Sequence, residues 1–311
     1  MRATSELAAL PVANGPPRTS PEETGGRRYV NTTLFIAPSV IALVVWMVVP
    51  TVLTLWFSIR RYNLLNPEIG FAGLQNYAFL LSDPSFWDAL LNTLELVGGV
   101  LVATVVIGTL FAVLFDQEFY GRGLARLLII APFFIMPTVS ALVWKNLLMH
   151  PVNGLFAFMT RSLGLGVVDW FGQFPLLAVG VIVAWQWIPF ATLILLTAMQ
   201  SLDHDQIEAA TMDGAKPVSK FFHIIVPHLA RPISVVVMIE TIFLLAVFAE
   251  ILVTTAGGPG TSTTTLTFLI YKTALLDFDI GGASAGGVLA IILANIVVIF
   301  LVRTVATNLD A

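Results

Sequence analysis

Cysteine is absent from this sequence of 311 residues. Its absence excludes disulfides, thiolate metal ligands and thiol nucleophiles. Charged residues are scarce as well, making up 11% of the chain against about 25% in an average soluble domain. Hydrophobic residues, in contrast, reach 57%. This composition excludes an ordinary soluble protein and indicates one whose surface mostly faces lipid.

Motifs that hold nucleotide phosphates or perform catalysis are also missing. No G-x-x-x-x-G-K-[ST] loop occurs, and no lysine directly follows a glycine. His223 and His228 are five positions apart, whereas a spacing of about four places two metal ligands on one helix face. No serine, histidine and aspartate set presents itself either. We therefore expect no cofactor on this chain and no enzymatic activity, which makes an intramembrane enzyme the weakest alternative.

Long apolar runs are what the sequence does contain. Each run has about 18 residues or more, enough for a helix rising about 1.5 Å per residue to cross the hydrocarbon core. A helix satisfies its own backbone hydrogen bonds where no water can. We therefore predict an all-α integral membrane protein with six transmembrane helices: Leu34–Phe57, Ala89–Phe115, Leu127–Trp144, Phe174–Gln200, Ile233–Val253 and Ile280–Val302.

Prolines and small residues distinguish two of these spans. Pro132 and Pro137 lie inside the third span, where each removes a backbone donor and crowds the preceding turn. We expect a kink there. The sixth span opens with GGASAGG, Gly281 to Gly287, whose small side chains favour close packing against a neighbouring helix.

The basic residues predict an orientation. With the N-terminus inside, the inner side holds ten of the fifteen: Arg2, Arg18, Arg27, Arg28, Arg122, Arg126, Lys216, Lys220, Arg231 and Arg303. Cytoplasmic loops carry an excess of Lys and Arg, so we expect both termini to be cytoplasmic, although the Arg60-Arg61 pair opposes the rule. Residues 1–30 are polar and lack the pattern of a signal peptide, which predicts a flexible cytoplasmic tail.

The segment 201–232, between the fourth and fifth spans, has the signals of a short helix. Asp203 or Asp205 can accept the free amide protons at its start, and Glu208 lies where the helix dipole favours an anion. Gly214 can end the helix in a left-handed conformation. We predict a helix of about ten residues followed by a turn at Asp213-Gly214.

Three prolines follow in the same segment. Pro217 suits the first position of a second short helix, and Pro227 and Pro232 are expected to stop that helix before the fifth span. The first helix could lie on lipid headgroups, but such helices have a large apolar face flanked by Lys and Arg, which QIEAATMDGA lacks. Its small residues favour docking into a groove on another protein.

At these residues the sequence resembles a known family. The pattern E-A-A-x-x-D-G-A, followed by Phe221, Ile224, Pro227 and Pro232, resembles the signature loop of permease subunits of ATP-binding-cassette importers, in the carbohydrate-uptake branch. SIRRYNLL and GFAGLQNYAFLLSDPSFWDALLNT, after the first span, are similar to an outer loop of such permeases. The stretch Val247 to Gly287 is similar to another outer loop and to the start of the last span, and its sequence most resembles the sorbitol and mannitol permeases. The resemblance covers residues 31–311, which we therefore interpret as the transmembrane permease domain.

The resemblance implies a coupling helix that seats in a cleft of a cytoplasmic ATPase. The residues that carry over position by position are Glu208, Ala209, Ala210, Asp213 and Gly214. It also implies an ATPase dimer that binds ATP and Mg²⁺, a second homologous permease, an extracytoplasmic solute-binding protein and a carbohydrate substrate, with no nucleic acid. The expected location is the inner (plasma) membrane of a bacterium. The implied mechanism is alternating access, with a polyol such as sorbitol or mannitol as the favoured substrate.

Polar groups inside the spans are candidates for the substrate path. Ionisable residues at membrane depth cost about 2.5–3.5 kcal/mol, so they normally face a cavity or a partner. Carboxylates and amides match the hydroxyls of a polyol, and aromatic rings can pack on its C–H faces. The candidates are Trp185, Gln186, Trp187, Glu240, Glu250 and Asn295.

Among these candidates, we hypothesise that Gln186, one of the two tryptophans and Glu240 face the path. The alternative is that Gln186 and Asn295 bond neighbouring helices while the tryptophans fill the interior. A second functional class also stays open, namely a secondary carrier driven by an ion gradient. Such a carrier would favour inverted repeats and helices broken at the midplane, and no convincing repeat relates the two halves of the sequence.

Overall fold

The computed structural model of the protein describes residues 32–309. The chain divides into two compact units, one ending at Val49 and the other beginning at Pro50. Helix α1, Thr32–Ser58, contributes its larger part to the first unit and its last turns to the second. The predicted tail, residues 1–30, lies outside the described residues.

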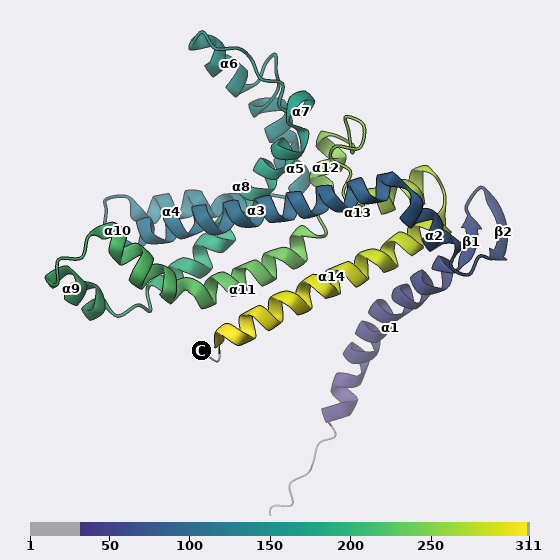
Figure 1. The fold of residues 1–311 in the computed structure, drawn as a ribbon, viewed down its shortest axis with the longest axis horizontal. Helices are drawn as coiled ribbons and strands as arrows, with labels where there is room; N and C mark the ends of the chain where they lie inside the picture. Colours follow the sequence, from purple (N-terminus) through teal and green to yellow (C-terminus); the bar gives the residue numbers. More distant parts are fainter. Residues whose placement is uncertain (1–31, 310–311) are drawn as a thin grey trace, which may run out of the picture. The chain divides into compact units, whose positions relative to one another are not determined.

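The second unit is mostly helical, and five helices of the described chain are long and apolar enough to cross a membrane. A bent pair of helical segments makes a sixth if it is counted as one span. Its elements after α1 are β1 Arg60–Asn63, β2 Asn66–Phe71, α2 Gln75–Ser82, α3 Pro84–Asp116, α4 Arg122–Ile130, η1 Ala131–Phe134, α5 Pro137–Val143, η2 Trp144–Leu148, α6 Leu155–Ser162, α7 Trp170–Gln173, α8 Pro175–Met199, α9 His204–Met212, α10 Pro217–Lys220, η3 Phe221–Ile225, α11 Val226–Leu244, α12 Ala249–Thr254, α13 Leu266–Tyr271, η4 Lys272–Leu276 and α14 Ile280–Leu309 (Figure 1).

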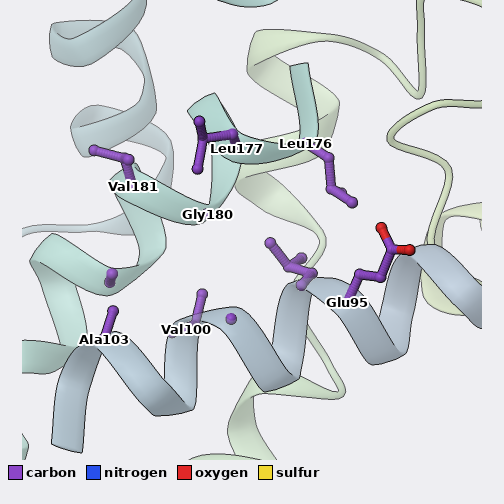
Figure 2. Close-up of a pocket in the computed structure, with 10 residues that line it drawn as sticks. Glu95, Val100, Ala103, Leu176, Leu177, Gly180 and Val181 are labelled. Atoms are coloured by element: carbon purple, nitrogen blue, oxygen red, sulfur yellow. The ribbon is translucent and has the colours of Figure 1, made fainter. Parts of the chain in front are cut away.

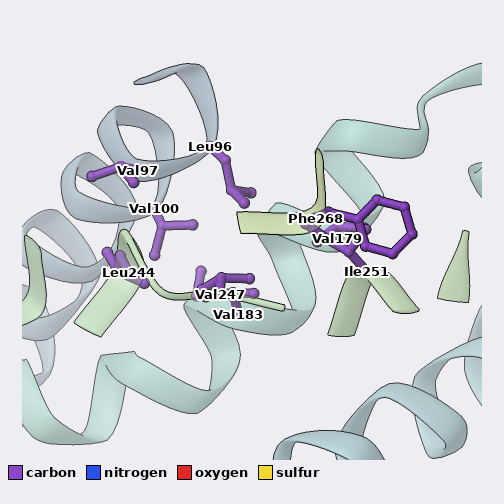
Figure 3. Close-up of a cluster of buried hydrophobic side chains, with 10 residues drawn as sticks. Leu96, Val97, Val100, Val179, Val183, Leu244, Val247, Ile251 and Phe268 are labelled. Carbon is purple, nitrogen blue, oxygen red and sulfur yellow. The ribbon is translucent and has the colours of Figure 1, made fainter. Parts of the chain in front are cut away.

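The core of this unit is built on α3 and α8, which lie side by side, with α11 packed against α8 and α14 against α11 (Figure 1). Asp83 caps α3 by accepting a hydrogen bond from the Ser85 amide, with Pro84 in the first turn. A buried apolar cluster joins α3 and α8 to the segment from the end of α11 to α13 (Figure 3). It contains Leu96, Val97, Val100, Val179, Val183, Leu244, Val247, Ile251 and Phe268.

Gly108 marks a close approach between α3 and α8. A Cβ atom added there would lie 2.8 Å from the Cβ of Ala191 and 3.2 Å from the backbone nitrogen of Thr192. Inside a bilayer, helices associate through such close van der Waals packing, because lipid tails are as apolar as the side chains. The small residues at 108 and 191 therefore set the spacing of the central helix pair.

Gly108→Ala is expected to destabilise the protein by about 1–3 kcal/mol, because the added methyl group overpacks this contact. Gly98→Ala is the matched control, since it changes the same residue type in the same helix and its Cβ would meet nothing within 4 Å. Both substitutions raise helix propensity equally. Thermal unfolding in detergent measures the difference, and equal stability of the two variants would contradict the packing argument.

The third predicted span, Leu127–Trp144, is broken rather than merely kinked. Its two halves, Arg122–Phe134 and Pro137–Leu148, meet at an angle of 107°. The expectation that Pro132 and Pro137 disturb this span is confirmed, because Pro132 lies in η1 and Pro137 begins α5. The disturbance is larger than the kink that was predicted within one helix. The two prolines together remove two backbone donors within six residues, and the chain turns instead.

The fifth span also differs from its predicted bounds of Ile233–Val253. Helical structure runs continuously from Pro217 to Leu244, and α12 follows after a break at residues 245–248. Pro227 and Pro232 therefore do not stop the second loop helix, contrary to prediction. The π turn η3 ends at Ile225, two residues before Pro227, and shifts the hydrogen-bond register there, since the Val226 amide bonds to the Phe221 carbonyl. Pro232 is tolerated inside α11.

A small antiparallel hairpin of β1 and β2 departs from the predicted all-α fold. Asn76 of α2 ties it down by donating to the carbonyls of Ser58 and Arg60, at 2.8 and 2.9 Å. The hairpin also reaches α14, where a side chain on Gly281 would collide with the Arg60 carbonyl. At Gly281 the close neighbour is therefore strand β1 of the hairpin and not the helix that was predicted to pack against GGASAGG.

Candidate coupling loop and substrate path

The loop between α8 and α11 folds as its sequence signals predict. The side chain of Asp203 caps α9 by accepting a 3.0 Å hydrogen bond from the Asp205 amide. Helix α9 ends at Met212, and Gly214 follows with a φ of 78°, in the left-handed region. The Ala215 amide then bonds to the Ala210 carbonyl at 2.9 Å, closing the helix end. Pro217 begins α10, as expected.

The small and acidic residues of α9 lie on an accessible surface. Glu208, Ala209, Asp213 and Gly214 are exposed, and Ala210 is half-buried. A Cβ atom added to Gly214 would meet nothing within 4 Å, so the glycine is needed for its backbone conformation and not for space. Figure 1 shows α9 and α10 at one end of the second unit and β1, β2 and α2 at the opposite end. This end of the unit offers a surface for another protein.

Gln186 and the two tryptophans beside it face different surroundings. The Gln186 amide donates a 3.1 Å hydrogen bond to the Ile135 carbonyl, which lies in the break of the third span, and its oxygen has no partner among the described residues. Trp185 packs edge-on against Trp144, with ring centroids 5.6 Å apart. Trp187 belongs to another aromatic cluster, whose other members are Phe133, Phe190 and Phe243.

Glu240 is fully buried at the contact between α11 and α3. Its Oε2 accepts a 2.6 Å hydrogen bond from the Thr104 hydroxyl, which is also fully buried. Oε1 has no partner in the described part of the chain. A carboxyl group at this depth is retained only where it has a defined role, either joining helices or serving the path.

Glu250 and Asn295 lie apart from that contact. Glu250 is buried in α12, whose last carbonyls, those of Val253 and Thr254, accept hydrogen bonds from the Lys145 ammonium group at 3.0 and 2.7 Å. Asn295 is exposed and donates to the Ile291 carbonyl of its own helix at 2.8 Å. The six candidates therefore do not form one cluster.

A groove of about 370 Å³ separates parts of α3 and α8, and it contains a charged residue that the sequence interpretation missed. Figure 2 shows the carboxylate of Glu95 at one end of this groove, near Leu176. The groove, called the apolar groove below, is lined by Glu95, Gly99 and Ala103 of α3 and by Leu176, Gly180 and Ala184 of α8, among others. No hydrogen bond or ion pair to Glu95 occurs within the described residues.

Glu95 also lines a second, polar hollow of about 360 Å³, called the polar mouth. Its other polar residues are Asp88 and Asn92 of α3 and Thr261 and Ser262 of the loop before α13. Asn92 fixes this loop by donating to the carbonyls of Thr261 and Thr264, at 2.7 and 3.0 Å. The spacing of 88, 92 and 95 puts three polar residues on one face of an apolar helix, a signal that could have been read from the sequence.

A family model supplies the decisive comparison. The model described as "Binding-protein-dependent transport system inner membrane component" matches residues 84–311, which include α3, α8, the loop that contains α9, and α14. The chain belongs to this family. It is an inner-membrane permease subunit of an ATP-binding-cassette importer of the sugar-transport type. As such it is a translocation component and not an enzyme, and it carries no cofactor itself.

Curated relatives agree with this family assignment. The chain is 37% identical over 254 residues to a probable ABC transporter permease protein of Sinorhizobium fredii, covering 81% of this chain and 82% of that one. It is 34% identical to the trehalose/maltose transport system permease protein MalF of Thermococcus litoralis, covering 80% and 85%. It is 29% identical to the sn-glycerol-3-phosphate permease protein UgpA of Salmonella typhimurium, covering 88% and 94%.

A solved structure supports the fold. The crystal structure of a bacterial ABC transporter that imports the acidic polysaccharide alginate matches with a TM-score of 0.74 at 22% identity, over 89% of this chain and 95% of that one. Permeases of this family work with a solute-binding protein, an ATPase and a second permease, and the present chain is one part of such a complex.

Proposed function

We propose that this permease forms part of an ATP-driven importer of sugars or sugar alcohols that works by alternating access. The observation that carries the proposal is the exposed α9, capped by Asp203 and ended by Gly214, at one end of the unit. Chemical energy cannot be supplied by this chain, because it lacks a phosphate-binding loop. ATP and Mg²⁺ bind to the partner ATPase, and α9 is the coupling helix that seats in its cleft.

The orientation proposed from the basic residues is consistent with this arrangement. It places α9 and both termini on the cytoplasmic side and the β1–β2 hairpin on the outer side. The separation of α9 from the hairpin supports it, because the two proposed faces lie at opposite ends of the second unit (Figure 1). The solute-binding protein then delivers its substrate to the end formed by the hairpin and the outer loops.

The proposed substrate path includes Gln186, Trp187 and Glu240. Trp187 supports it, because its aromatic cluster brings together η1, α8 and α11, the elements around the break in the third span. Gln186 adds an unpaired amide oxygen to the same region. In the state described here Glu240 is buried, so its contribution requires the rearrangement that alternating access supplies.

The substrate is proposed to be a polyol such as sorbitol or mannitol, and this proposal rests only on the sequence of an outer loop. The names of the related permeases refer to other substrates, namely trehalose or maltose, and sn-glycerol 3-phosphate. All of these candidate substrates carry several hydroxyl groups. A panel of sorbitol, mannitol, maltose, trehalose, sn-glycerol 3-phosphate and alginate oligosaccharides therefore tests the substrate class and the polyol together.

Reconstitution tests the function itself. The chain in vesicles with its second permease, ATPase and binding protein is expected to accumulate one member of the panel only when ATP is supplied on the ATPase side. Vesicles with this chain alone are the control and should accumulate none. Accumulation by the chain alone, driven by an ion gradient, would show that it is a secondary carrier.

A further inference from the structure

Glu95 is a charged residue in an apolar span that the proposed path does not yet use. It lies six positions after Ala89, where the second span is predicted to begin, or about 9 Å along the helix at 1.5 Å per residue. Its side chain is exposed, and it has no hydrogen-bond partner in the described residues. Ionisable groups at such depth face water-filled cavities or binding partners rather than lipid.

The two hollows that meet at Glu95 differ in chemistry. On the outer side, the polar mouth offers carboxylate, amide and hydroxyl groups from Asp88, Asn92 and Thr261. On the inner side, the apolar groove runs along Gly99 and Ala103 of α3, opposite Gly180 and Ala184 of α8 (Figure 2). Small residues at these four positions keep the groove open, because larger side chains would fill it.

We infer that Glu95 is a substrate-binding residue at the entrance of the translocation path, where it accepts hydrogen bonds from the hydroxyls of a neutral carbohydrate. A sugar has hydroxyl edges and apolar C–H faces, and the junction of polar mouth and apolar groove presents a matching surface to each. Each hollow has a volume in the range of small-molecule sites. This inference rests on the proposed function, since it assumes that the transported molecule is a carbohydrate.

The absence of cysteine makes a direct test possible. Glu95→Cys and Leu94→Cys each introduce one thiol into a chain that has none, at neighbouring positions of equal depth. Leu94 is 43% exposed but does not belong to the residues that line the apolar groove or the polar mouth, so it is the matched control. The assembled complex, with its binding protein in nanodiscs, is treated with a negatively charged methanethiosulfonate reagent.

We expect the reagent to modify Glu95→Cys but not Leu94→Cys. The modification should slow about tenfold when the panel sugar that best stimulates ATP hydrolysis is present at about ten times its dissociation constant, because only the free site reacts. Equal reaction at both positions, or no protection by the sugar, overturns the inference. A thiol at position 95 that the reagent does not reach but that cross-links to the second permease also overturns it, and shows a contact between subunits instead.

Glu95→Gln gives an independent measurement. We expect it to raise the half-saturating sugar concentration about tenfold, since an amide replaces a charge-assisted acceptor. An unchanged value overturns the inference. The Leu94→Cys complex separates this failure from failure of the proposed function. If no sugar of the panel stimulates ATP hydrolysis by the Leu94→Cys complex, the proposal of a carbohydrate importer is wrong. If one sugar does, but it neither protects the thiol at position 95 nor binds more weakly to Glu95→Gln, only the proposed role of Glu95 is wrong.

Discussion

Ala209→Trp is expected to abolish sugar-stimulated ATP hydrolysis in the assembled complex while the chain still inserts and folds. Ala209 is exposed, so an indole there need not displace any neighbour within the chain. If α9 seats in the ATPase cleft as proposed, the indole ring should prevent seating and the ATPase should no longer respond to sugar. We expect a fall of at least about 100-fold in stimulated hydrolysis, equivalent to about 2.8 kcal/mol.

Gly214→Val tests the same interface through the backbone. A β-branched residue disfavours the left-handed conformation at φ 78°, at a cost of about 1–2 kcal/mol, so the end of α9 should loosen. Leu110→Trp is the control, because Leu110 is 55% exposed in α3 and belongs neither to α9 nor to the hairpin end where the binding protein is proposed to dock. Wild-type stimulation in Ala209→Trp would show that α9 does not dock on the ATPase.

Thr104→Val is expected to lower the free energy of unfolding by about 1–3 kcal/mol, because it leaves the buried Glu240 carboxyl without its described hydrogen-bond donor. The valine keeps the shape of the threonine and removes only the hydroxyl. Thr109→Val is the matched control. Thr109 is also a buried threonine of α3, but its hydroxyl bonds only to the Val105 carbonyl of its own helix.

A double-mutant cycle then isolates the pair. Glu240→Leu is expected to be nearly neutral for stability, since replacing a buried ionisable group by an apolar one of similar size often is. Adding it to Thr104→Val should recover most of the lost stability. Strictly additive effects in thermal unfolding of the purified complex would contradict the pairing. If Glu240→Leu is stable but transports poorly, the carboxyl serves the path as well as the helix contact.

Local chemistry made the coupling loop predictable from sequence. The Asp203 cap, the Gly214 turn and the Pro217 start each act within a few residues, so their signals survive without knowledge of the rest of the fold. The same reasoning failed at Pro227 and Pro232. A π turn upstream, which has no sequence signature of comparable strength, shifts the hydrogen-bond register at Pro227, and Pro232 is tolerated inside α11.

Side-chain partners inside the unit could not be predicted in the same way. Gln186 pairs with a carbonyl 51 positions away and Glu240 with a hydroxyl 136 positions away, and such distances depend on how the helices are arranged. Glu95 is a different case. Its spacing from Asp88 and Asn92 is visible in the sequence, but the residues of α8 and of the loop before α13 that lie opposite this face depend on how the helices are arranged.

The unbroken helix from Pro217 to Leu244 has a mechanical consequence. It begins within the candidate coupling loop and carries Glu240 close to its far end. The π turn η3, Pro227 and Pro232 all lie in its first sixteen residues, but helical structure continues through them, so displacement of α10 is expected to move Glu240 as well. The joints that could take up this movement are residues 245–248, where the helix stops, and the 107° break of the third span.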